Sequence, residues 1–254
     1  SRLRQALGIA LQSRPRALLV GLGVTAALQS STATALMVTS FAAAGAVALV
    51  PALAAMLGAN LGTALIVQLL SFEPHALAPA LVLAGVVAFH RGSRSRTRDL
   101  GRVAIGLGLM LIALRLLSAT MAPVETSPTL RAVLAALADH PLPNLLLAAG
   151  IAWAAHSSIA GVLFVASLAG AGAVGPQAAL AMVLGANLGS AINPLLAAGG
   201  DARDRARLRL PVGNLLNRLL GAMLALALLP QAAALLHALD PAPARLVANA
   251  HLAF

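Results

Sequence analysis

The feature that most constrains the fold is a run of 55 residues, 17–71, that contains no charged side chain. Two more uncharged runs follow at 76–90 and 142–200. A helix needs about 20 apolar residues to cross a bilayer, so the first run is long enough for several passes or hairpins. Only 9% of the residues are charged, against about 25% in soluble domains. We therefore expect an all-α polytopic membrane protein.

An internal repeat divides the chain. Residues 29–63 align with 156–190 at a constant offset of 127, and 20 of the 35 pairs are identical. The copies begin with QSSTA and HSSIA, and they close on GANLGT and GANLGS. A bias toward Ala and Leu raises the identity, but it does not place polar motifs at constant spacing. We interpret the chain as two copies of one helical unit.

The arginines indicate how the two copies are oriented. Residues 2–16, before the first copy, hold four arginines, and 203–209, after the second, also hold four. The corresponding segments 129–143 and 71–80 hold one and none. Cytoplasmic loops collect arginine, so the copies should have inverted topology, as in many secondary transporters. We expect a multi-pass protein of the cell inner (plasma) membrane with a cytoplasmic N-terminus.

The repeat predicts two halves, 1–120 and 121–254, each with a re-entrant helical hairpin followed by transmembrane helices. The expected bounds are hairpin 17–48 with helices 51–70, 77–90 and 103–120, then hairpin 143–175 with helices 177–198, 210–229 and 243–254. Arginine-rich loops should lie at 91–102 and 203–209, and Pro51 and Pro176 at turns. Because the chain starts without methionine and stops in an apolar stretch, we expect a C-terminally truncated fragment.

Polar side chains interrupt the apolar sequence where each copy begins, at Gln29–Thr32 with Thr34 and at His156–Ser158. Non-helical backbone at membrane depth is tolerated only inside protein or beside a water-filled cavity. A helix N-terminus at these serines would offer N–H groups and hydroxyls to an anion. Two inverted hairpins would bring both tips together near the midplane. The alternative, that these side chains only join packed helices, stays open.

The second pair of motifs, GANLGT at 58–63 and GANLGS at 185–190, contains the polar residues Asn60 and Thr63 in one copy and Asn187 and Ser190 in the other. Their uncharged oxygens suit sodium, and unwound carbonyls beside the glycines would add ligands. The alternative is a close helix contact, because Gly58 and Gly62 have Gly-x-x-x-Gly spacing. Packing and ligation can coexist, so both interpretations stay open.

Two arginines, Arg115 and Arg218, lie within expected helices. An intramembrane charge is a functional-site hypothesis by default, although Arg115 could instead snorkel to the outer face. His156 is a candidate pH-sensitive group or a neutral hydrogen-bond donor. The sequence holds no acid pair, Ser–His–Asp grouping or metal cluster at recognised spacing, so we expect no enzyme, no catalytic residue and no organic cofactor. With 2% aromatic residues, the net charge of +10 does not predict nucleic-acid binding.

The motifs LQSSTAT at 28–34 and GANLGT at 58–63 resemble those of the sodium-dependent phosphate cotransporter family of the type II kind, which includes bacterial relatives. That family has two inverted repeats, each with a QSSS-type motif followed by a GANIGT-type motif. The resemblance covers nearly the whole chain and implies phosphate between the hairpin tips, with sodium (Na+) alongside. With the reasoning above, it assigns phosphate to Ser30, Ser31, Thr32, Ser157, Ser158 and Arg218, and sodium to Gln29, Thr34, Asn60, Thr63, His156, Asn187 and Ser190.

The chain departs from the family pattern in places. Thr32 and Ile159 replace the third serine, and His156 replaces the second glutamine, which leaves sodium stoichiometry and the coupling ion open. A family element of the form His-x-x-Phe-Asn is approximated by residues 251–254 and poorly matched by 214–218.

We therefore expect sodium-coupled transport of inorganic phosphate by alternating access around a midplane site between the two tips. The expected partners are phosphate and the lipid bilayer, with a homodimer as an open alternative. Rival functions are the same fold moving another oxyanion or coupled to protons, and a non-transporting phosphate-sensing membrane module. The sequence leaves the choice between import and efflux open.

Overall fold

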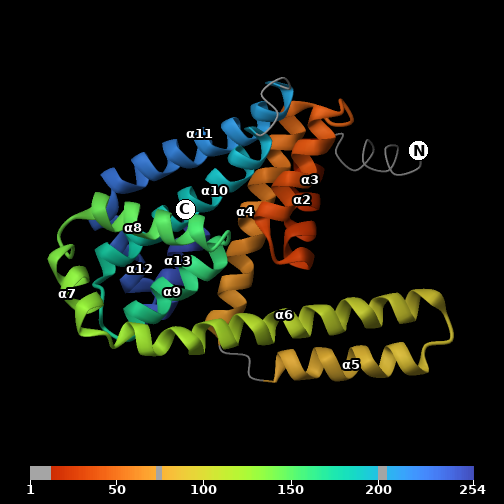
Figure 1. The fold of residues 1–254 in the computed structure, drawn as a ribbon, viewed down its shortest axis with the longest axis horizontal. Helices are drawn as coiled ribbons and strands as arrows, with labels where there is room; N and C mark the ends of the chain where they lie inside the picture. The colour runs from red at the N-terminus through yellow and green to blue at the C-terminus, as the bar shows by residue number, and fades with distance from the viewer. Residues whose placement is uncertain (1–12, 73–75, 200–204) are drawn as a thin grey trace.

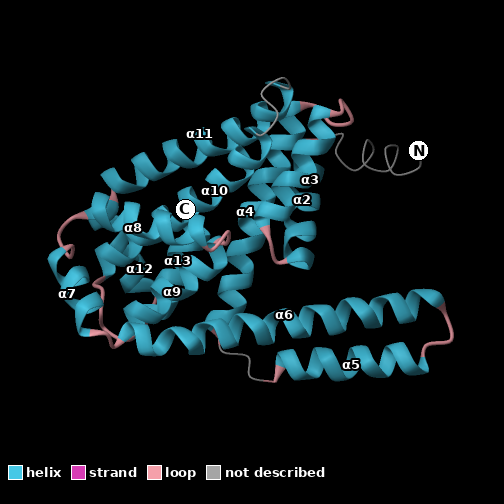
Figure 2. Ribbon diagram, viewed as in Figure 1, coloured by secondary structure: helices cyan, strands magenta, loops and turns pink. Residues whose placement is uncertain are grey.

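A computed structural model describes residues 13–72, 76–199 and 205–254. Within these ranges every regular element is a helix, and Figure 2 shows helices joined by loops. The helices are α2 (Arg14–Leu28), α3 (Ser31–Ala43), α4 (Leu49–Ser71), α5 (Leu77–Arg91), α6 (Ser95–Glu125), α7 (Pro128–Ala136), α8 (Pro141–Ala154), α9 (Ser158–Gly170), α10 (Pro176–Gly199), α11 (Arg205–Ala227), α12 (Leu229–Leu239) and α13 (Pro243–Ala253).

Three of these helices are long and apolar enough to cross a membrane when the described residues are searched. They are α4, α10 and residues 206–227 of α11. This agrees with the expected all-helical membrane protein.

The sequence repeat recurs in the helix boundaries. Helices α2, α3 and α4 begin at residues 14, 31 and 49, and α8, α9 and α10 begin 127 residues later, at 141, 158 and 176. Left-handed backbone conformations recur at the same offset, because Gln29 and His156 have φ of 51° and 52°, and Gly45 and Gly172 have φ of 68° and 66°. Each copy therefore folds as the same three-helix unit.

The glycines of the second motif pair bring helices into close contact. A Cβ added at Gly58 of α4 would lie 1.9 Å from the Leu18 carbonyl oxygen of α2, and one at Gly185 of α10 would lie 2.0 Å from that of Leu145 in α8. Both α4 and α10 continue as unbroken helix through these motifs. The expectation of unwound carbonyls there is therefore wrong, and the close-packing alternative explains the glycines.

Helix directions follow from four pairs of neighbouring residues. Leu53 packs against Gly213 near the start of α4 and α11, and Asn60 meets Arg218 further along both, so these helices run in the same direction. Arg218 also meets Ser190, while Asn214 lines the same crevice as Pro194, so α10 runs opposite to α11. The repeat-equivalent helices α4 and α10 therefore run in opposite directions.

Two clusters of buried side chains form the core. The larger one gathers α8, α9, α10, α12 and α13 together with Ile66 and Val67 at the end of α4. The smaller one joins α2, α3 and the start of α4 to Leu210 of α11. The larger cluster therefore holds the end of α4 against α10, and the smaller one holds the first half of α4 against the start of α11.

Helices α5 and α6 form a hairpin that extends away from the other helices (Figure 1). The turn between them is only 92–94, so most of the arginine-rich loop expected at 91–102 is instead helix α6. In the other expected loop, residues 205–209 belong to α11, while 203 and 204 lie outside the described residues. Pro51 lies in the first turn of α4 and Pro176 begins α10, where a missing N–H is tolerated.

Candidate functional site

Each hairpin tip is a capped helix N-terminus. Gln29 and His156 adopt left-handed backbone conformations just after α2 and α8, and the next residue, Ser30 or Ser157, is an N-cap. The Ser30 hydroxyl accepts a hydrogen bond from the Ala33 N–H at 3.1 Å, and the Ser157 hydroxyl accepts one from the Ala160 N–H at 3.1 Å. The predicted helix starts are confirmed, but these two hydroxyls are engaged as caps, which N-terminal N–H groups need.

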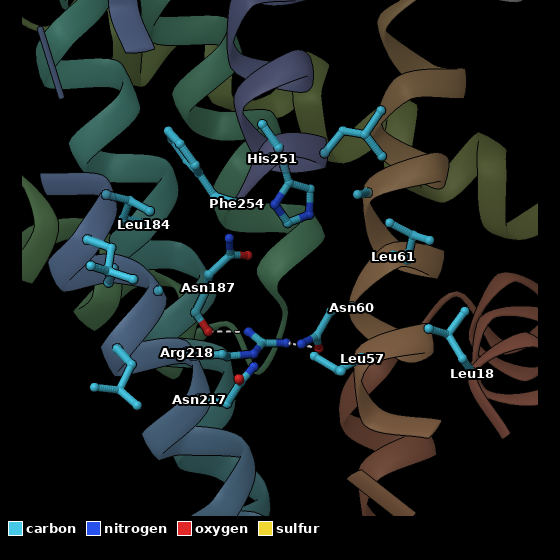
Figure 3. Close-up of a pocket in the computed structure, with 17 residues that line it drawn as sticks. Leu18, Leu57, Asn60, Leu61, Leu184, Asn187, Asn217, Arg218, His251 and Phe254 are labelled. Atoms are coloured by element: carbon cyan, nitrogen blue, oxygen red, sulfur yellow. Dashed lines mark hydrogen bonds between the residues drawn. The ribbon is translucent and has the colours of Figure 1, made fainter. Parts of the chain in front are cut away.

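Arg218 joins the three candidate spans. Its Nη2 donates to the side-chain oxygen of Asn60 in α4, and its Nη1 donates to the backbone carbonyl of Asn187 in α10. Nη1 also lies 3.0 Å from the hydroxyl of Ser190, to which it donates. Asn60 and Asn187 are equivalent in the two repeats, so the guanidinium lies where the copies meet (Figure 3).

The acceptors around Arg218 are all neutral. Its Nε is buried and has no hydrogen-bond partner among the described residues. A guanidinium carries five donors and remains charged in proteins. A cation held at the junction of three spans by amide, carbonyl and hydroxyl oxygens keeps its full positive charge for an anionic ligand.

Arg218 also separates two hollows. A small crevice on one side is lined by Ser31, Thr32 and Ser190, with Ala35, Met56, Ala191, Pro194 and Asn214. A cavity of about 470 Å³ on the other side is lined by side chains from α2, α4, α10, α11 and α13. The polar residues of this cavity are Asn60, Asn187, Asn217, Arg218 and His251.

The crevice brings together only part of the predicted phosphate site. Ser31 and Thr32, at the first turn of α3, share it with Arg218, whereas Ser157 and Ser158 do not line it. Ser158 is buried at the start of α9 and its hydroxyl has no partner. Helix α3 contacts the opposite repeat through α10 and α11, whereas α9 contacts it through α4 and α6.

Among the predicted sodium ligands, three side chains form hydrogen bonds within or near their own helices. The Thr63 and Ser190 hydroxyls donate to the carbonyls of Asn60 and Asn187, at 2.7 and 3.1 Å. The Thr34 hydroxyl donates to the Ser30 carbonyl at 3.1 Å and accepts from Thr25 at 2.8 Å. The same contact, to the carbonyl three residues earlier, occurs in both motifs, at Thr63 and at Ser190.

Asn60 and Asn187 contact Arg218, as described above, and the remaining two predicted sodium ligands lie at the tips. The Gln29 side-chain oxygen is buried without a partner, whereas His156 is exposed.

Sequence reasoning assigned no role to three groups that the structure places at this centre. His251 and Asn217 line the cavity, and Asn214 lines the crevice. Pro194 lies inside α10, and without an N–H it cannot donate to the Ser190 carbonyl beside Arg218. The signal available in the sequence was polar or proline residues within otherwise apolar helices.

These features define a helical membrane protein with a cationic polar centre at the contact between its two repeats. The model of the family described as Na+/Pi-cotransporter matches residues 1–119 and 123–237, so this chain belongs to that family of transporters. The family resemblance inferred from the motifs is confirmed.

Several bacterial proteins are similar in sequence. The chain is 39% identical over 252 residues to the "Putative inorganic phosphate export protein YjbB" of Salmonella typhimurium, covering 99% of this chain and 46% of that protein. It is 41% identical over 226 residues to the Escherichia coli K12 protein of the same name, covering 89% and 41%. It is 28% identical over 241 residues to the "Uncharacterized protein YqeW" of Bacillus subtilis, covering 94% and 77%.

The chain therefore spans less than half the length of the enterobacterial relatives. No solved structure matches it significantly.

Proposed function

We propose that this chain moves inorganic phosphate across the membrane with sodium as the coupling ion. The observation that carries the proposal is Arg218, a cation held only by neutral acceptors where α4, α10 and α11 meet. An unpaired charge at that depth is costly and marks an ion pathway. A phosphate oxyanion supplies the missing negative charge.

The phosphate is proposed to bind beside the first turn of α3, in the crevice there, which is too narrow for a water molecule in this structure and must widen to admit the ion. The free N–H groups of a helix N-terminus favour anions, and Ser31 and Thr32 lie there with Arg218. Ser30, Ser157 and Ser158 remain in the proposed site through the tip backbone. Participation of Ser157 and Ser158 requires the α9 tip to move toward the crevice during the transport cycle.

Sodium is proposed to bind to uncharged oxygens near the same centre. Asn60, Thr63, Asn187 and Ser190 supply amide, hydroxyl and carbonyl oxygens, and Gln29, Thr34 and His156 are the further predicted ligands at the tips. The Ser190 carbonyl lacks the usual helical donor because Pro194 follows four residues later. A hard cation beside the anion also lowers the repulsion between phosphate and the surrounding oxygens.

Alternating access between two inverted repeats is the proposed mechanism. Helices α2, α3, α8 and α9 have 13 to 15 residues, roughly 20–22 Å of helix against a hydrocarbon core of about 30 Å, which favours re-entrant hairpins. The opposite directions of α4 and α10 support the inversion. The two proposed halves, 1–120 and 121–254, rock relative to each other about Arg218. During this motion Arg218 exchanges its hydrogen bonds to neutral oxygens for contacts with phosphate.

The proposed location is the bacterial inner membrane, with the N-terminus in the cytoplasm. The names of the enterobacterial relatives favour export as the direction of net transport. Export of phosphate driven by the sodium gradient moves the two ions in opposite directions, whereas sodium-driven uptake moves them together. The direction of phosphate flux is therefore measured separately from its dependence on sodium.

The test is flux of labelled phosphate in proteoliposomes that carry a sodium gradient, with a matched potassium gradient as control. We expect saturable, sodium-dependent flux that falls to background in Arg218→Gln. Arg16→Gln, which removes an exposed arginine at the start of α2, is the matched control and should keep the flux.

Flux in vesicles loaded with phosphate and in empty vesicles separates export from import. Saturable binding of phosphate without flux would replace transport by a sensing function. Equal flux with potassium would remove sodium from the mechanism. A folded chain that neither binds nor moves phosphate would refute the proposal.

A further inference from the structure

The cavity on the far side of Arg218 from the α3 tip contains a polar group that the proposed phosphate site does not use. His251, in the last turns of α13, is only 5% exposed and lines this cavity. Both of its ring nitrogens are buried and have no hydrogen-bond partner within residues 13–72, 76–199 and 205–254. Buried polar groups in native proteins are almost always bonded, so two unsatisfied nitrogens on one ring point to a missing ligand.

The surroundings of His251 show which kind of ligand is missing. Figure 3 shows the imidazole and Arg218 facing the same space, with Asn187 and Asn217 at its edge. Arg218 brings a positive charge, and its Nε also lacks a partner. A neutral imidazole offers one N–H donor and one acceptor nitrogen. This combination of charge and donors suits an oxyanion rather than a cation.

The cavity is large enough for an oxyanion with bound water. Its volume is about 470 Å³, far above the roughly 10–15 Å³ that a single water molecule requires by the same measure. The remaining walls are apolar, among them Leu57, Leu184 and Phe254. An ion there would therefore find its polar contacts at the end where Arg218 and His251 lie.

We infer that His251 and Arg218 form a second oxyanion-binding subsite in this cavity, in which the imidazole donates a hydrogen bond to phosphate and Arg218 supplies the charge. The inference rests on the proposed function in taking phosphate as the anion. Arg218 then lies between two anion subsites, one at the α3 tip and one at α13, and phosphate passes from one to the other across the guanidinium. His251 is a ligand of the second subsite.

The test is equilibrium binding of labelled inorganic phosphate to the chain in nanodiscs of zwitterionic lipid. His251→Leu removes both nitrogens and should weaken phosphate binding at least tenfold, since hydrogen bonds to charged groups are the strong ones. His251→Asn and His251→Gln return an amide N–H near the Nδ1 and Nε2 positions. One of them should bind within about threefold of the original chain. His237→Leu, an exposed histidine in α12, is the control and should bind unchanged.

The outcomes separate this inference from the proposed function. If His251→Leu has an unchanged thermal unfolding midpoint and unchanged phosphate binding, while Arg218→Gln loses binding, the second subsite is refuted and the proposed function stands. If the original chain binds no phosphate, both fail. If neither amide variant restores the binding lost in His251→Leu, a merely structural role replaces the ligand role.

The same oxyanion chemistry occurs in lipid headgroups, so nanodiscs with anionic phospholipid form a second arm. Free phosphate as the ligand predicts the same His251→Leu effect in both kinds of nanodisc. If that variant instead loses only co-purified anionic lipid and keeps its phosphate affinity, the subsite belongs to a lipid phosphate, and the assignment to free phosphate is overturned.

Discussion

At the scale of single residues, the contacts of Arg218 decide what the polar centre can do. One guanidinium reaches Asn60 of the first repeat and both Asn187 and Ser190 of the second. Its planar fork of donors suits acceptors that lie in different directions, and a lysine ammonium on a flexible stem does not reproduce it. The sequence marked Arg218 as an intramembrane charge, but its three acceptors follow only from the packing of α4, α10 and α11.

Arg218→Lys tests the fork geometry at constant charge. We expect phosphate affinity to fall at least tenfold, or about 1.4 kcal/mol, because the ammonium cannot hold Asn60 and Asn187 and also face the anion. Equilibrium phosphate binding measures the loss. An unchanged affinity in the lysine variant would mean that charge is sufficient and that the fork is irrelevant.

Ser30 and Ser31 are neighbours with different expected roles. Ser30→Ala removes the N-cap of α3 and should destabilise the fold by about 1 kcal/mol, seen as a lower thermal unfolding midpoint. Ser31→Ala should leave that midpoint nearly unchanged and weaken phosphate binding severalfold, because Ser31 lines the crevice.

The same substitution at Ser158 tests the second tip. Weaker phosphate binding in Ser158→Ala would support its place in the site, whereas unchanged binding would restrict the site to the α3 tip. If Ser31→Ala also binds normally, the crevice is not the phosphate site.

At the scale of helices, both repeats contain the same close contact. A glycine of the GANLG motif lies against a backbone carbonyl of the first helix of that repeat. Gly58 meets Leu18, and its equivalent Gly185 meets Leu145. The motif GANLG therefore indicated close helix contact correctly, while its polar residues lie at the surface that Arg218 contacts.

Gly185→Ala should be strongly destabilising, by at least about 1–3 kcal/mol, because the new methyl group would overlap a backbone carbonyl that cannot move without shifting α8. Gly150→Ala is the matched control within α8, since no atom lies within 4 Å of the added Cβ. Its unfolding midpoint should stay equal or rise, as alanine favours helix. Similar midpoints for the two variants would contradict the tight contact.

Helix α13 is held to the end of α4 by Arg245, and this contact sets the position of His251. Arg245 donates to Gln68 at 3.2 Å, to Ser71 at 3.0 Å and to Asp240 at 3.0 Å, and its guanidinium lies 3.8 Å from the centre of the Phe72 ring. Asn249 accepts a hydrogen bond from Gln68 at 2.7 Å. This cluster joins residues more than 170 positions apart.

The pH dependence of stability should report on this cluster. Hydrogen bonds from Arg245 and from the Ala242 N–H hold the pKa of Asp240 below its ordinary value. A lowered carboxylate pKa stabilises the fold at neutral pH, and the contribution is lost as pH falls through that pKa. Asp240→Asn should therefore have a lower unfolding midpoint than the original chain at pH 7, and the difference should shrink toward acid. A constant difference would exclude the carboxylate charge as the cause.

At the scale of the whole molecule, the open question is the orientation of the two halves in the membrane. The chain contains no cysteine, so single cysteines report orientation without background labelling. Ser13→Cys and Ser95→Cys should react with a membrane-impermeant thiol reagent from the cytoplasmic side, and Thr129→Cys from the opposite side. All three positions are exposed. Reaction of all three from one side would contradict the inverted arrangement.

Local sequence accounts for much of the fold. Long uncharged runs require helices in a membrane, because only helices satisfy their backbone hydrogen bonds within one segment. The polar interruptions at Gln29–Thr32 and His156–Ser158 locate the helix breaks to within a residue or two, since serine caps a helix start. The loop bounds at 91–102 were wrong because arginine is a good helix former, and charge does not end a helix.

The sequence by itself determined the repeat, the helical class, the capped tips and the family, because each depends on residues close together in the chain or at a fixed offset. Only the tertiary structure decided which polar residues meet. Asn60, Asn187, Arg218 and His251 come from four helices, and their meeting depends on helix directions and on glycine contacts that set the spacing. For the same reason the Ser157–Ser158 tip lies outside the crevice that holds Ser31, although both tips carry a Ser-Ser pair, since similar motifs occupy different surroundings once the helices pack.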